Sequence, residues 1–329
     1  MNLIEFIGYG WKYTKASRYS VGEKVNSADS VCFVANKGTE KWILGAKARR
    51  LSKYSEKSVG VSFITKDAEV LQADGYFYLH HNSFSQMLQA KPEILEKKNI
   101  VMFTHPVLKS ATSARHLVFL LNMADKVIFL NQEHAKLLVS HGLKVEKTVV
   151  MPMASDAKMF LPHERSGEGK VVISMGYYQR KNPTLMHEII RLMPHREFIL
   201  IGKDWDQYEQ FDEMKALPNF EYYDSIPYDD YPKLYAESDV FLSTSKLEGG
   251  PVPLLETMLC NLVPVASKTG FCVDIINHGE NGFLFELDAK AEEVLPMIEA
   301  AYLMKVNARD FVIDYTWQNS AEKIDVLFN

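Results

Sequence analysis

Two carboxylates, Glu248 and Glu256, are separated by seven residues and enclose a Gly-Gly step and two prolines. Residues 253–259 predict the start of a buried helix, because proline is tolerated in a first helical turn. Gly249 and Gly250 have no side chains, so a polar ligand could approach their N–H groups at the positive end of that helix. This pattern indicates two carboxylates that hold one polyhydroxylated ligand. The alternative is a proline-led helix whose first-turn glutamate only complements the helix dipole.

A second candidate loop runs from Gly176 to Pro183, between a predicted strand and a predicted helix. Its adjacent cations, Arg180 and Lys181, could neutralise a diphosphate together with the N–H groups of the helix, without a metal. The alternative is an exposed turn whose cations are solvated.

The elements around the carboxylate pair suggest the fold that positions it. Residues 231–245 predict an amphipathic helix followed by a short strand, and residues 261–270 predict a second apolar strand that ends in a glycine turn. This order resembles the nucleotide-sugar half of retaining glycosyltransferases of the GT-B fold, specifically family four with its E-x7-E signature. The resemblance is good over about residues 170–285 and fair over 126–160.

The resemblance implies roles for these residues. Glu256 would accept hydrogen bonds from ribose hydroxyls, and Glu248 would hold the donor sugar with the main chain of the two glycines. Lys181 matches the family's phosphate-binding lysine. Tyr177 stands where the family often has arginine, so Arg180 would complete the clamp. The implied reaction is metal-independent hexosyl transfer with same-face attack, and no cofactor beyond the nucleotide-diphosphate sugar.

Further candidates follow strands of the first half. Gly8 and Gly10 come after the predicted strand 3–7, where the family has a glycine-rich loop, and Gly176 begins the corresponding loop of the second half. His105 ends the predicted strand 100–103 and resembles the family's active-site histidine. Turn glycines and a structural histidine remain the alternatives.

Two more polar motifs have both a functional and a structural explanation. His80 and His81 end another predicted strand, where histidines are often only hydrogen-bonded. Asp204 and Asp206 form a D-x-D pattern, for which we expect a solvated acidic loop and no metal.

The 329 residues favour two domains, each with its own core. Strand-like and helical segments alternate throughout, which predicts parallel sheets covered by helices on both faces. We therefore expect an α/β protein of two Rossmann-like domains, 1–165 and 166–308, facing each other across a cleft. Residues 309–329 would form a helix that crosses back to the first domain, with Trp317 packed against it.

Charge is unevenly distributed between the halves. Residues 1–165 carry 23 Lys and Arg against 15 Asp and Glu, and residues 166–329 carry 14 against 27. The positive half favours an anionic acceptor, such as a phosphate-bearing glycan or a lipid-linked sugar, and nucleic acid is not expected. Lys47, Arg50 and Lys53 share one face of a predicted helix. That face predicts either contact with an anionic membrane or a solvated surface.

The sequence also predicts a location. The three cysteines lie in apolar stretches without a C-x-x-C pair, and no apolar run approaches the length of a membrane span. We expect a cytoplasmic protein, with association at the inner membrane face as a further hypothesis. Two other functions remain open: a catalytically silent GT-B-like binding protein, and an NAD(P)-dependent oxidoreductase. The second is disfavoured because no G-x-G-x-x-G opens a helix after the first strand of either half.

Overall fold

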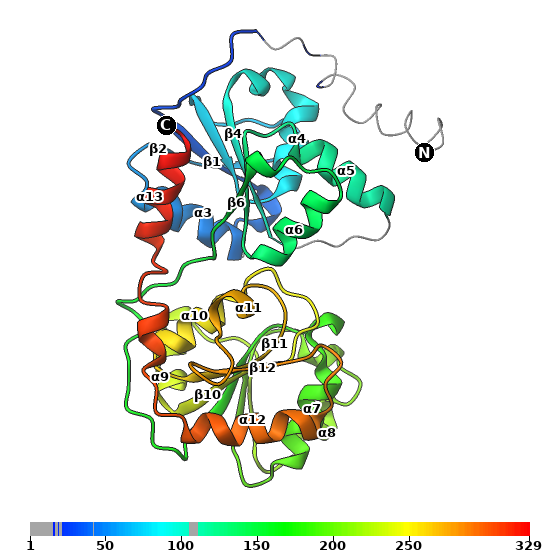
Figure 1. Ribbon diagram of the computed structural model, residues 1–329, viewed down its shortest axis with the longest axis vertical. Coiled ribbons are helices and arrows are strands. Elements are labelled where there is room, and N and C mark those ends of the chain that lie inside the picture. Colours follow the sequence, from blue (N-terminus) through cyan, green and yellow to red (C-terminus); the bar gives the residue numbers. More distant parts are fainter. Residues whose placement is uncertain (1–15, 17–18, 20–21, 42, 105–110) are drawn as a thin grey trace. The chain divides into compact units, whose positions relative to one another are not determined.

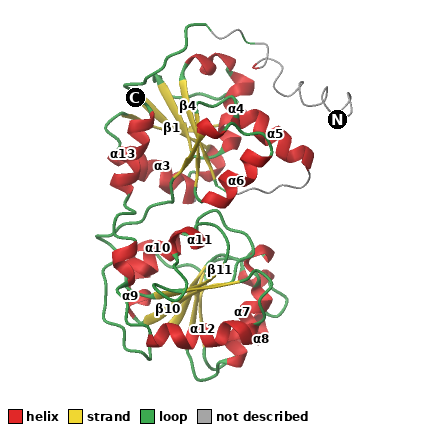
Figure 2. Ribbon diagram, viewed as in Figure 1, coloured by secondary structure: helices red, strands yellow, loops and turns green. Residues whose placement is uncertain are grey.

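The computed structural model describes residues 16, 19, 22–41, 43–104 and 111–329. The chain forms two compact units, one of residues 1–152 with 317–329 and one of residues 153–316. Each unit is built on a six-stranded parallel sheet with helices on both faces, as the alternating pattern predicts (Figures 1 and 2).

The first sheet has the strand order β2-β1-β3-β4-β5-β6. Its strands are β1 (Val31–Asn36), β2 (Ser58–Ile64), β3 (Gly75–Tyr78), β4 (Lys98–Phe103), β5 (Lys126–Phe129) and β6 (Thr148–Val150). The helices of this unit are α3 (Ile43–Tyr54), α4 (His81–Ala90), α5 (Ala111–Leu121), α6 (Gln132–Ser140) and α13 (Trp317–Leu327).

Alternation along β1 explains why both faces of this sheet are covered. Cys32 and Val34 join one core with Phe84 of α4. Phe33 points the other way and packs against Phe77 of β3, with ring centroids 5.3 Å apart. Strands that are apolar on both sides need helices on both sides, which is typical of parallel sheets.

The second sheet has the order β12-β11-β10-β7-β8-β9. Its strands are β7 (Lys170–Ser174), β8 (Phe198–Ile201), β9 (Phe220–Tyr223), β10 (Ser238–Ser243), β11 (Val263–Ser267) and β12 (Phe283–Phe285). Its helices are α7 (Pro183–Leu192), α8 (Phe211–Lys215), α9 (Tyr231–Ala236), α10 (Val252–Leu259), α11 (Cys272–Ile275) and α12 (Ala291–Leu303). Helices α7 and α12 cover one face, where Ile189 and Val294 pack with Val171 and Val240.

The second unit begins at Met153, so residues 153–165 belong to it and the expected boundary at residue 165 is wrong. Arg165 fixes the end of this stretch, since its guanidinium donates to two main-chain carbonyls of residues 304 and 306 at 2.7 and 3.0 Å. The turn-rich segment that follows, just before β7, is held in the same unit. The buried carboxylate of Asp239 accepts hydrogen bonds from the main-chain N–H groups of Ser166, Gly167 and Gly169 at 3.2, 2.7 and 2.9 Å. It also accepts one from the Ser166 hydroxyl at 3.1 Å. A segment fixed this way to β10 cannot act as a flexible linker.

The C-terminal boundary is also later than residue 308. Arg309 donates to the carbonyls of Ala157, Phe160 and Leu259, at 2.6–2.8 Å, and so keeps residues 308–311 in the second unit. The chain joins the first unit at Trp317, where α13 begins and packs against α3 (Figure 1). A terminal helix that returns to the first unit is therefore confirmed.

Helix α13 also changes the interpretation of the cationic face of α3. Lys47 is only 5% exposed, and the Arg50 guanidinium lies 5.4 Å from the ring centroid of the buried Trp317. Lys47 and Arg50 are thus engaged within the unit, whereas Lys53, the third cation of the predicted face, is exposed. Among the described residues, no helix has both the length and the apolarity needed to cross a bilayer.

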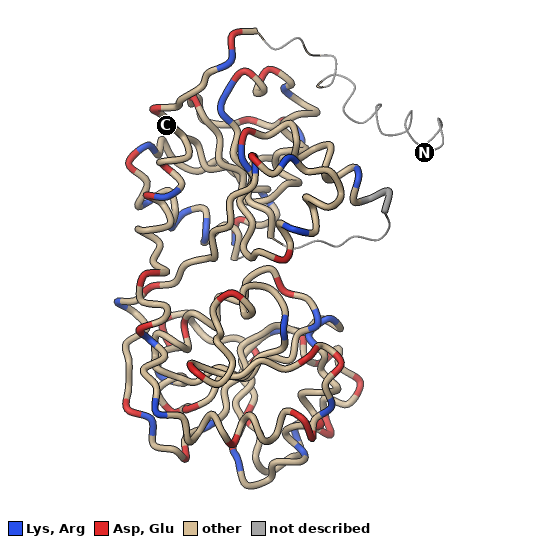
Figure 3. Tube along the Cα trace, viewed as in Figure 1, with Lys and Arg blue, Asp and Glu red and all other residues tan. Residues whose placement is uncertain are grey.

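Lys and Arg are distributed over the trace of the first unit (Figure 3). Several of them lie at the amino ends of its strands. Lys57, Lys98, Lys126 and Lys147 each begin or directly precede a strand. Their ammonium groups donate to main-chain carbonyls at 2.5–2.8 Å. Because ligands of such sheets bind at the carboxyl ends, these four charges are placed to stabilise loops rather than to attract an acceptor.

We predict that Asp239→Ala lowers the free energy of unfolding by about 2–4 kcal/mol, because several partly buried N–H groups of the segment before β7 lose their shared acceptor. Urea denaturation measures the change. Asp212→Ala is the control, since Asp212 pairs with Lys215 at the surface and its side chain is 94% exposed, so little change is expected. Equal stability of Asp239→Ala and wild type would contradict the assigned role.

Candidate active site

The structure brings Glu248, Arg180 and Lys181 together in the second unit. Glu248 follows β10, and the two cations follow β7, which is the neighbouring parallel strand. Carboxyl ends of adjacent parallel strands lie at the same edge of a sheet, so residues 67 positions apart become neighbours. Lys181 Nζ donates to Glu248 Oε1, and Arg180 Nη1 lies 3.4 Å from Glu248 Oε2.

Glu248 is buried at 7% exposure, yet it is held in the ionised form. Burial is the largest single influence and opposes ionisation, but the charges of Lys181 and Arg180 and the hydrogen bond from Lys181 together outweigh it. The pKa of Glu248 therefore lies below its ordinary value. The main-chain N–H of Glu248 donates to Thr269 Oγ1 at 3.0 Å and so fixes the main chain from which the carboxylate extends.

The cation loop is held by the main chain as well as by charge. Arg180 Nη1 donates to the carbonyl of Leu247 at 2.5 Å, and the carbonyl of Arg180 accepts from the N–H of Lys246 at 2.7 Å. The side chain of Lys181 is only 12% exposed. An exposed turn with solvated cations, the alternative from the sequence, does not describe this loop.

The glycines at the site differ in how much room their neighbours would leave for a side chain. A Cβ on Gly250 would lie 2.4 Å from the ring of Phe271, so Gly250 is required by packing rather than by an open main chain. Gly270 has a φ of +59°, and a Cβ there would lie 2.9 Å from the Cβ of Glu248. Gly176 has room, since an added Cβ would make an ordinary 3.6 Å contact with the carbonyl of Lys203. Gly249 is buried.

Glu256 is 3% exposed and lies in α10, which starts at Val252. Glu256 is thus the fifth residue of the helix, one residue further along than expected and just past the first turn. Its Oε1 accepts a hydrogen bond from the Tyr228 hydroxyl at 2.5 Å, and its Oε2 accepts one from the Tyr235 hydroxyl at 3.3 Å. The carboxylate is therefore oriented by two phenols.

The tyrosines that hold Glu256 were not predicted from the sequence. Tyr228, Tyr231 and Tyr235 are spaced at three and four residues, which places them on one side of the segment that leads into α9. Tyr228 and Tyr235 both pack against Phe160, with ring centroids 5.7 Å apart in each case. The spacing of the tyrosines was the available signal.

Tyr177, which replaces the family's usual arginine, packs against aromatic rings. Its ring lies 5.5 Å from that of Trp205 and 6.4 Å from that of Tyr208. Its main-chain N–H donates to the carbonyl of Lys203 at 2.8 Å. The position is thus part of the core beneath the loop, and Arg180 supplies the second cation beside Glu248.

The remaining candidates either have structural roles or lie outside the described residues. His80 caps α4 by accepting a hydrogen bond from the Asn82 N–H at 3.1 Å, and its ring stacks on that of His81. Asp204 has a left-handed φ of 66° and precedes the buried Trp205. No group of three or more His, Cys, Asp or Glu suited to a metal occurs in the described part of the chain. Gly8, Gly10 and His105 lie outside the described residues.

Comparisons with known proteins agree with this architecture. Residues 156–312 match the protein family described as "Glycosyl transferases group 1". A curated sulfoquinovosyl transferase of Arabidopsis thaliana, SQD2, is 25% identical over 190 residues, which is 51% of this chain and 37% of that protein. A phosphatidylinositol N-acetylglucosaminyltransferase protein of the same plant is 23% identical over 206 residues, covering 57% and 45%. The chain thus spans less than half of the length of these relatives.

Solved structures show the likeness over most of the chain. Sucrose-phosphate synthase from Thermosynechococcus elongatus superposes with a TM-score of 0.74 at 13% identity, covering 91% of this chain and 98% of that one. Anabaena HepE, solved with UDP and glucose, gives a TM-score of 0.68 at 17% identity, covering 91% and 97%. The chain has the GT-B fold, and the family match supports a glycosyltransferase.

We predict that Glu248→Gln makes the free energy of unfolding less dependent on pH in the acidic range. Because the folded-state pKa of Glu248 is depressed, its ionised form stabilises the protein above about pH 4.3, and this stabilisation is lost as the pH falls toward the folded-state pKa. Urea unfolding of the variant should therefore change less between about pH 5 and pH 3 than that of wild type.

The control for this measurement is Glu286→Gln, which removes an exposed carboxylate paired with Lys268 at the surface. This variant should keep the acid dependence of wild type. If Glu248→Gln and wild type lose stability in parallel on acidification, the ion cluster does not hold Glu248 ionised.

Proposed function

We propose that this protein is a retaining glycosyltransferase that moves a hexosyl group from a nucleotide-diphosphate sugar to a hydroxyl acceptor. The observation that carries the proposal is the buried Glu248 beside Lys181 and Arg180, at the carboxyl edge of the second sheet. A ligand that is both polyhydroxylated and anionic matches this combination of carboxylate and cations.

Each residue then has a distinct task. Lys181 and Arg180 bind the donor diphosphate and stabilise the charge that builds up on it as the anomeric bond breaks. Glu248, kept ionised by the same cations, accepts hydrogen bonds from the donor sugar's hydroxyls. Glu256, oriented by Tyr228 and Tyr235, accepts hydrogen bonds from the ribose. A leaving phosphate oxygen takes the acceptor's proton, and attack occurs on the same face of the sugar.

The positive charge of the Arg180–Lys181 pair is what supports metal-independent transfer, since it can do what a divalent cation does for a leaving diphosphate. UDP-glucose is the first donor to test, because Anabaena HepE binds UDP and glucose. We also propose a cytoplasmic location, supported by three cysteines that are all free and buried. Peripheral contact with an anionic membrane remains part of the proposal for a lipid-linked acceptor.

A catalytically silent nucleotide-sugar-binding protein is the second candidate. It is favoured by Tyr177, whose ring is committed to packing on Trp205 at the position of a usual family arginine. Such a protein would bind UDP-glucose but release no UDP from it.

We predict that Glu248→Gln and Lys181→Ala each lower UDP release from UDP-glucose by about 10²-fold or more, because each removes charge placed at the reacting centre. Chromatography of released UDP, with EDTA present, measures the rate. Lys233→Ala is the control, since Lys233 is exposed and pairs with Asp230 away from Glu248. Unchanged rates in the two site variants would refute the assigned roles, and loss of wild-type activity in EDTA would refute metal independence.

We predict that Tyr228→Phe weakens UDP binding by about tenfold, because Glu256 Oε1 loses the hydrogen bond that orients it. Calorimetric titration with UDP and with 2′-deoxy-UDP measures the two affinities. The loss of affinity caused by Tyr228→Phe should be smaller for 2′-deoxy-UDP, which lacks the ribose 2′-hydroxyl. Tyr231→Phe is the matched control, since that ring packs on Tyr228 at 5.6 Å without a hydrogen bond to Glu256 among the described residues. Equal UDP affinity in Tyr228→Phe and the control would remove Tyr228 from the site.

A further inference from the structure

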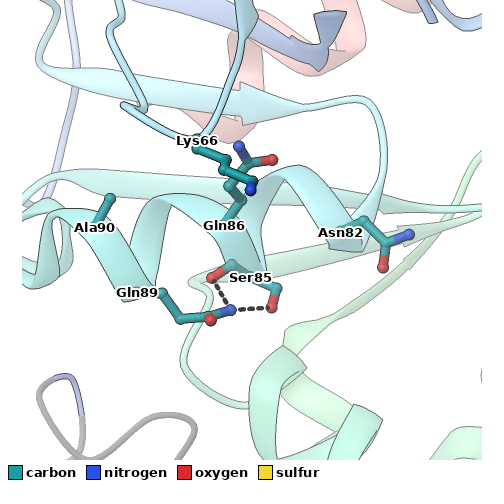
Figure 4. A pocket seen from close by; sticks show the side chains of 6 residues that line it. All are labelled: Lys66, Asn82, Ser85, Gln86, Gln89 and Ala90. Atoms are coloured by element: carbon teal, nitrogen blue, oxygen red, sulfur yellow. Dashed lines mark hydrogen bonds between the residues drawn. The ribbon is translucent and has the colours of Figure 1, made fainter. Parts of the chain in front are cut away.

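A polar pocket of about 520 Å³ lies against α4 in the first unit. Its lining combines one ammonium group, three primary amides, a hydroxyl and a methyl group, from Lys66, Asn82, Gln86, Gln89, Ser85 and Ala90. Five of these residues lie on one side of α4, because their spacing follows the helical repeat. Figure 4 shows Lys66 extending from the loop after β2 toward Gln86.

The central amide of the pocket is held in a fixed orientation. Gln86 Oε1 accepts a hydrogen bond from Asn36 Nδ2 at 2.7 Å, and Gln86 Nε2 donates to the carbonyl of Thr65. Asn36 is itself fixed, since its Oδ1 accepts from the Ser83 hydroxyl at 2.7 Å. A planar amide held at both ends presents its remaining donor and acceptor in set directions.

The surrounding polar groups are available to a ligand. Gln89 Nε2 donates to the carbonyl and hydroxyl of Ser85 at 3.0 and 3.1 Å, and both bonds are drawn in Figure 4. Within the described part of the chain, Gln89 Oε1, the Asn82 side-chain amide and the Lys66 ammonium have no hydrogen-bond or ion-pair partner. Three groups with unused capacity therefore surround the fixed Gln86.

One end of the pocket lies near the ligand-binding edge of the first sheet, and the rest follows α4 to its last residue. Asn36 is the last residue of β1, Thr65 directly follows β2, and α4 starts three residues after the end of β3. Ligands of open parallel sheets bind outside the carboxyl ends of the strands, which is where these three positions lie. The volume falls within the range of about 300–1,000 Å³ that is usual for small-molecule sites.

We infer that this pocket binds an uncharged, hydroxyl-rich sugar residue of the acceptor. Primary amides both donate and accept hydrogen bonds, as sugar hydroxyls do, and three of them line the described wall. An anionic group is a poorer match, because Lys66 is the one cation of the described lining and the Asn82 N–H in the first turn of α4 is occupied by His80. The role as acceptor site rests on the proposed function, whereas the binding of a neutral sugar can be measured without it.

This inference revises the acceptor class that net charge favours. Four lysines of the first unit lie at the opposite, amino-terminal edge of its sheet, where they hold carbonyl groups. The chemistry beside α4 is mainly that of amides and a hydroxyl, with one ammonium group from Lys66. The structure thus assigns the glycan-recognising groups of this unit to the α4 pocket rather than to its basic charges.

The test uses the full chain with saturating UDP on an array of immobilised oligosaccharides. The array carries neutral glucose, galactose, mannose and N-acetylglucosamine oligomers, their sulfated counterparts, and vesicles containing phosphatidylserine. We expect retention on at least one neutral oligomer, and a loss of about tenfold or more in its affinity for Asn82→Ala/Gln89→Ala, which removes two hydrogen-bonding groups. Gln318→Ala, an exposed amide on α13 of the same unit, is the matched control and should bind as wild type does.

Several results would overturn the inference: no retention on any neutral oligomer, equal affinity of the double variant and wild type, or retention only on sulfated oligomers or vesicles. Thermal shift with UDP on the same preparations separates this inference from the proposed function. Stabilisation by UDP without neutral-glycan binding leaves the proposed function standing and rejects the pocket's role. Glycan binding that depends on Asn82 and Gln89, without any stabilisation by UDP, supports the pocket as a sugar site and contradicts the proposed function.

Discussion

The contact on which the candidate active site depends is the buried cluster of Glu248 with Lys181 and Arg180. A carboxylate at 7% exposure cannot remain ionised by itself, because burial raises its pKa, and the two cations reverse that effect. The cluster is possible only because β7 and β10 are adjacent and parallel, so that the loops after them meet at one edge. Removing either partner would leave a buried charge without compensation.

Close packing around this cluster requires glycine at two positions. Gly250 gives room to the ring of Phe271, and Gly270 lets the chain pass the Cβ of Glu248. Both glycines are explained by close packing, with no ligand needed. The packing of the protein alone therefore sets the position of the Glu248 carboxylate. Sites on rigid elements are normally supported in this way.

The two edges of each parallel sheet are used differently. In the first unit, lysines at the amino edge hold carbonyl groups of neighbouring loops, whereas Asn36, Thr65 and the start of α4 gather polar groups near the carboxyl edge. In the second unit, Glu248 and its cations lie at the carboxyl edge. Net charge, which sums over both edges, is thus a poor guide to what either unit binds.

The sequence by itself determined the architecture, because alternation of short apolar strands with helical segments is a local property that predicts parallel sheets with two covered faces. It also singled out Glu248, Arg180 and Lys181, since each lies in a loop between a predicted apolar strand and a predicted helix, where a ligand can reach a helix N-terminus. Side-chain partnerships across the fold were decided only by tertiary structure, because they depend on strand order. The phenols of Tyr228 and Tyr235 on Glu256, the packing of Gly250 against Phe271 and the stacking of Arg50 on Trp317 each join residues that lie far apart in the chain. The unit boundaries were decided in the same way, since Arg165 and Arg309 hold their segments in the second unit by hydrogen bonds to carbonyls far away in the chain.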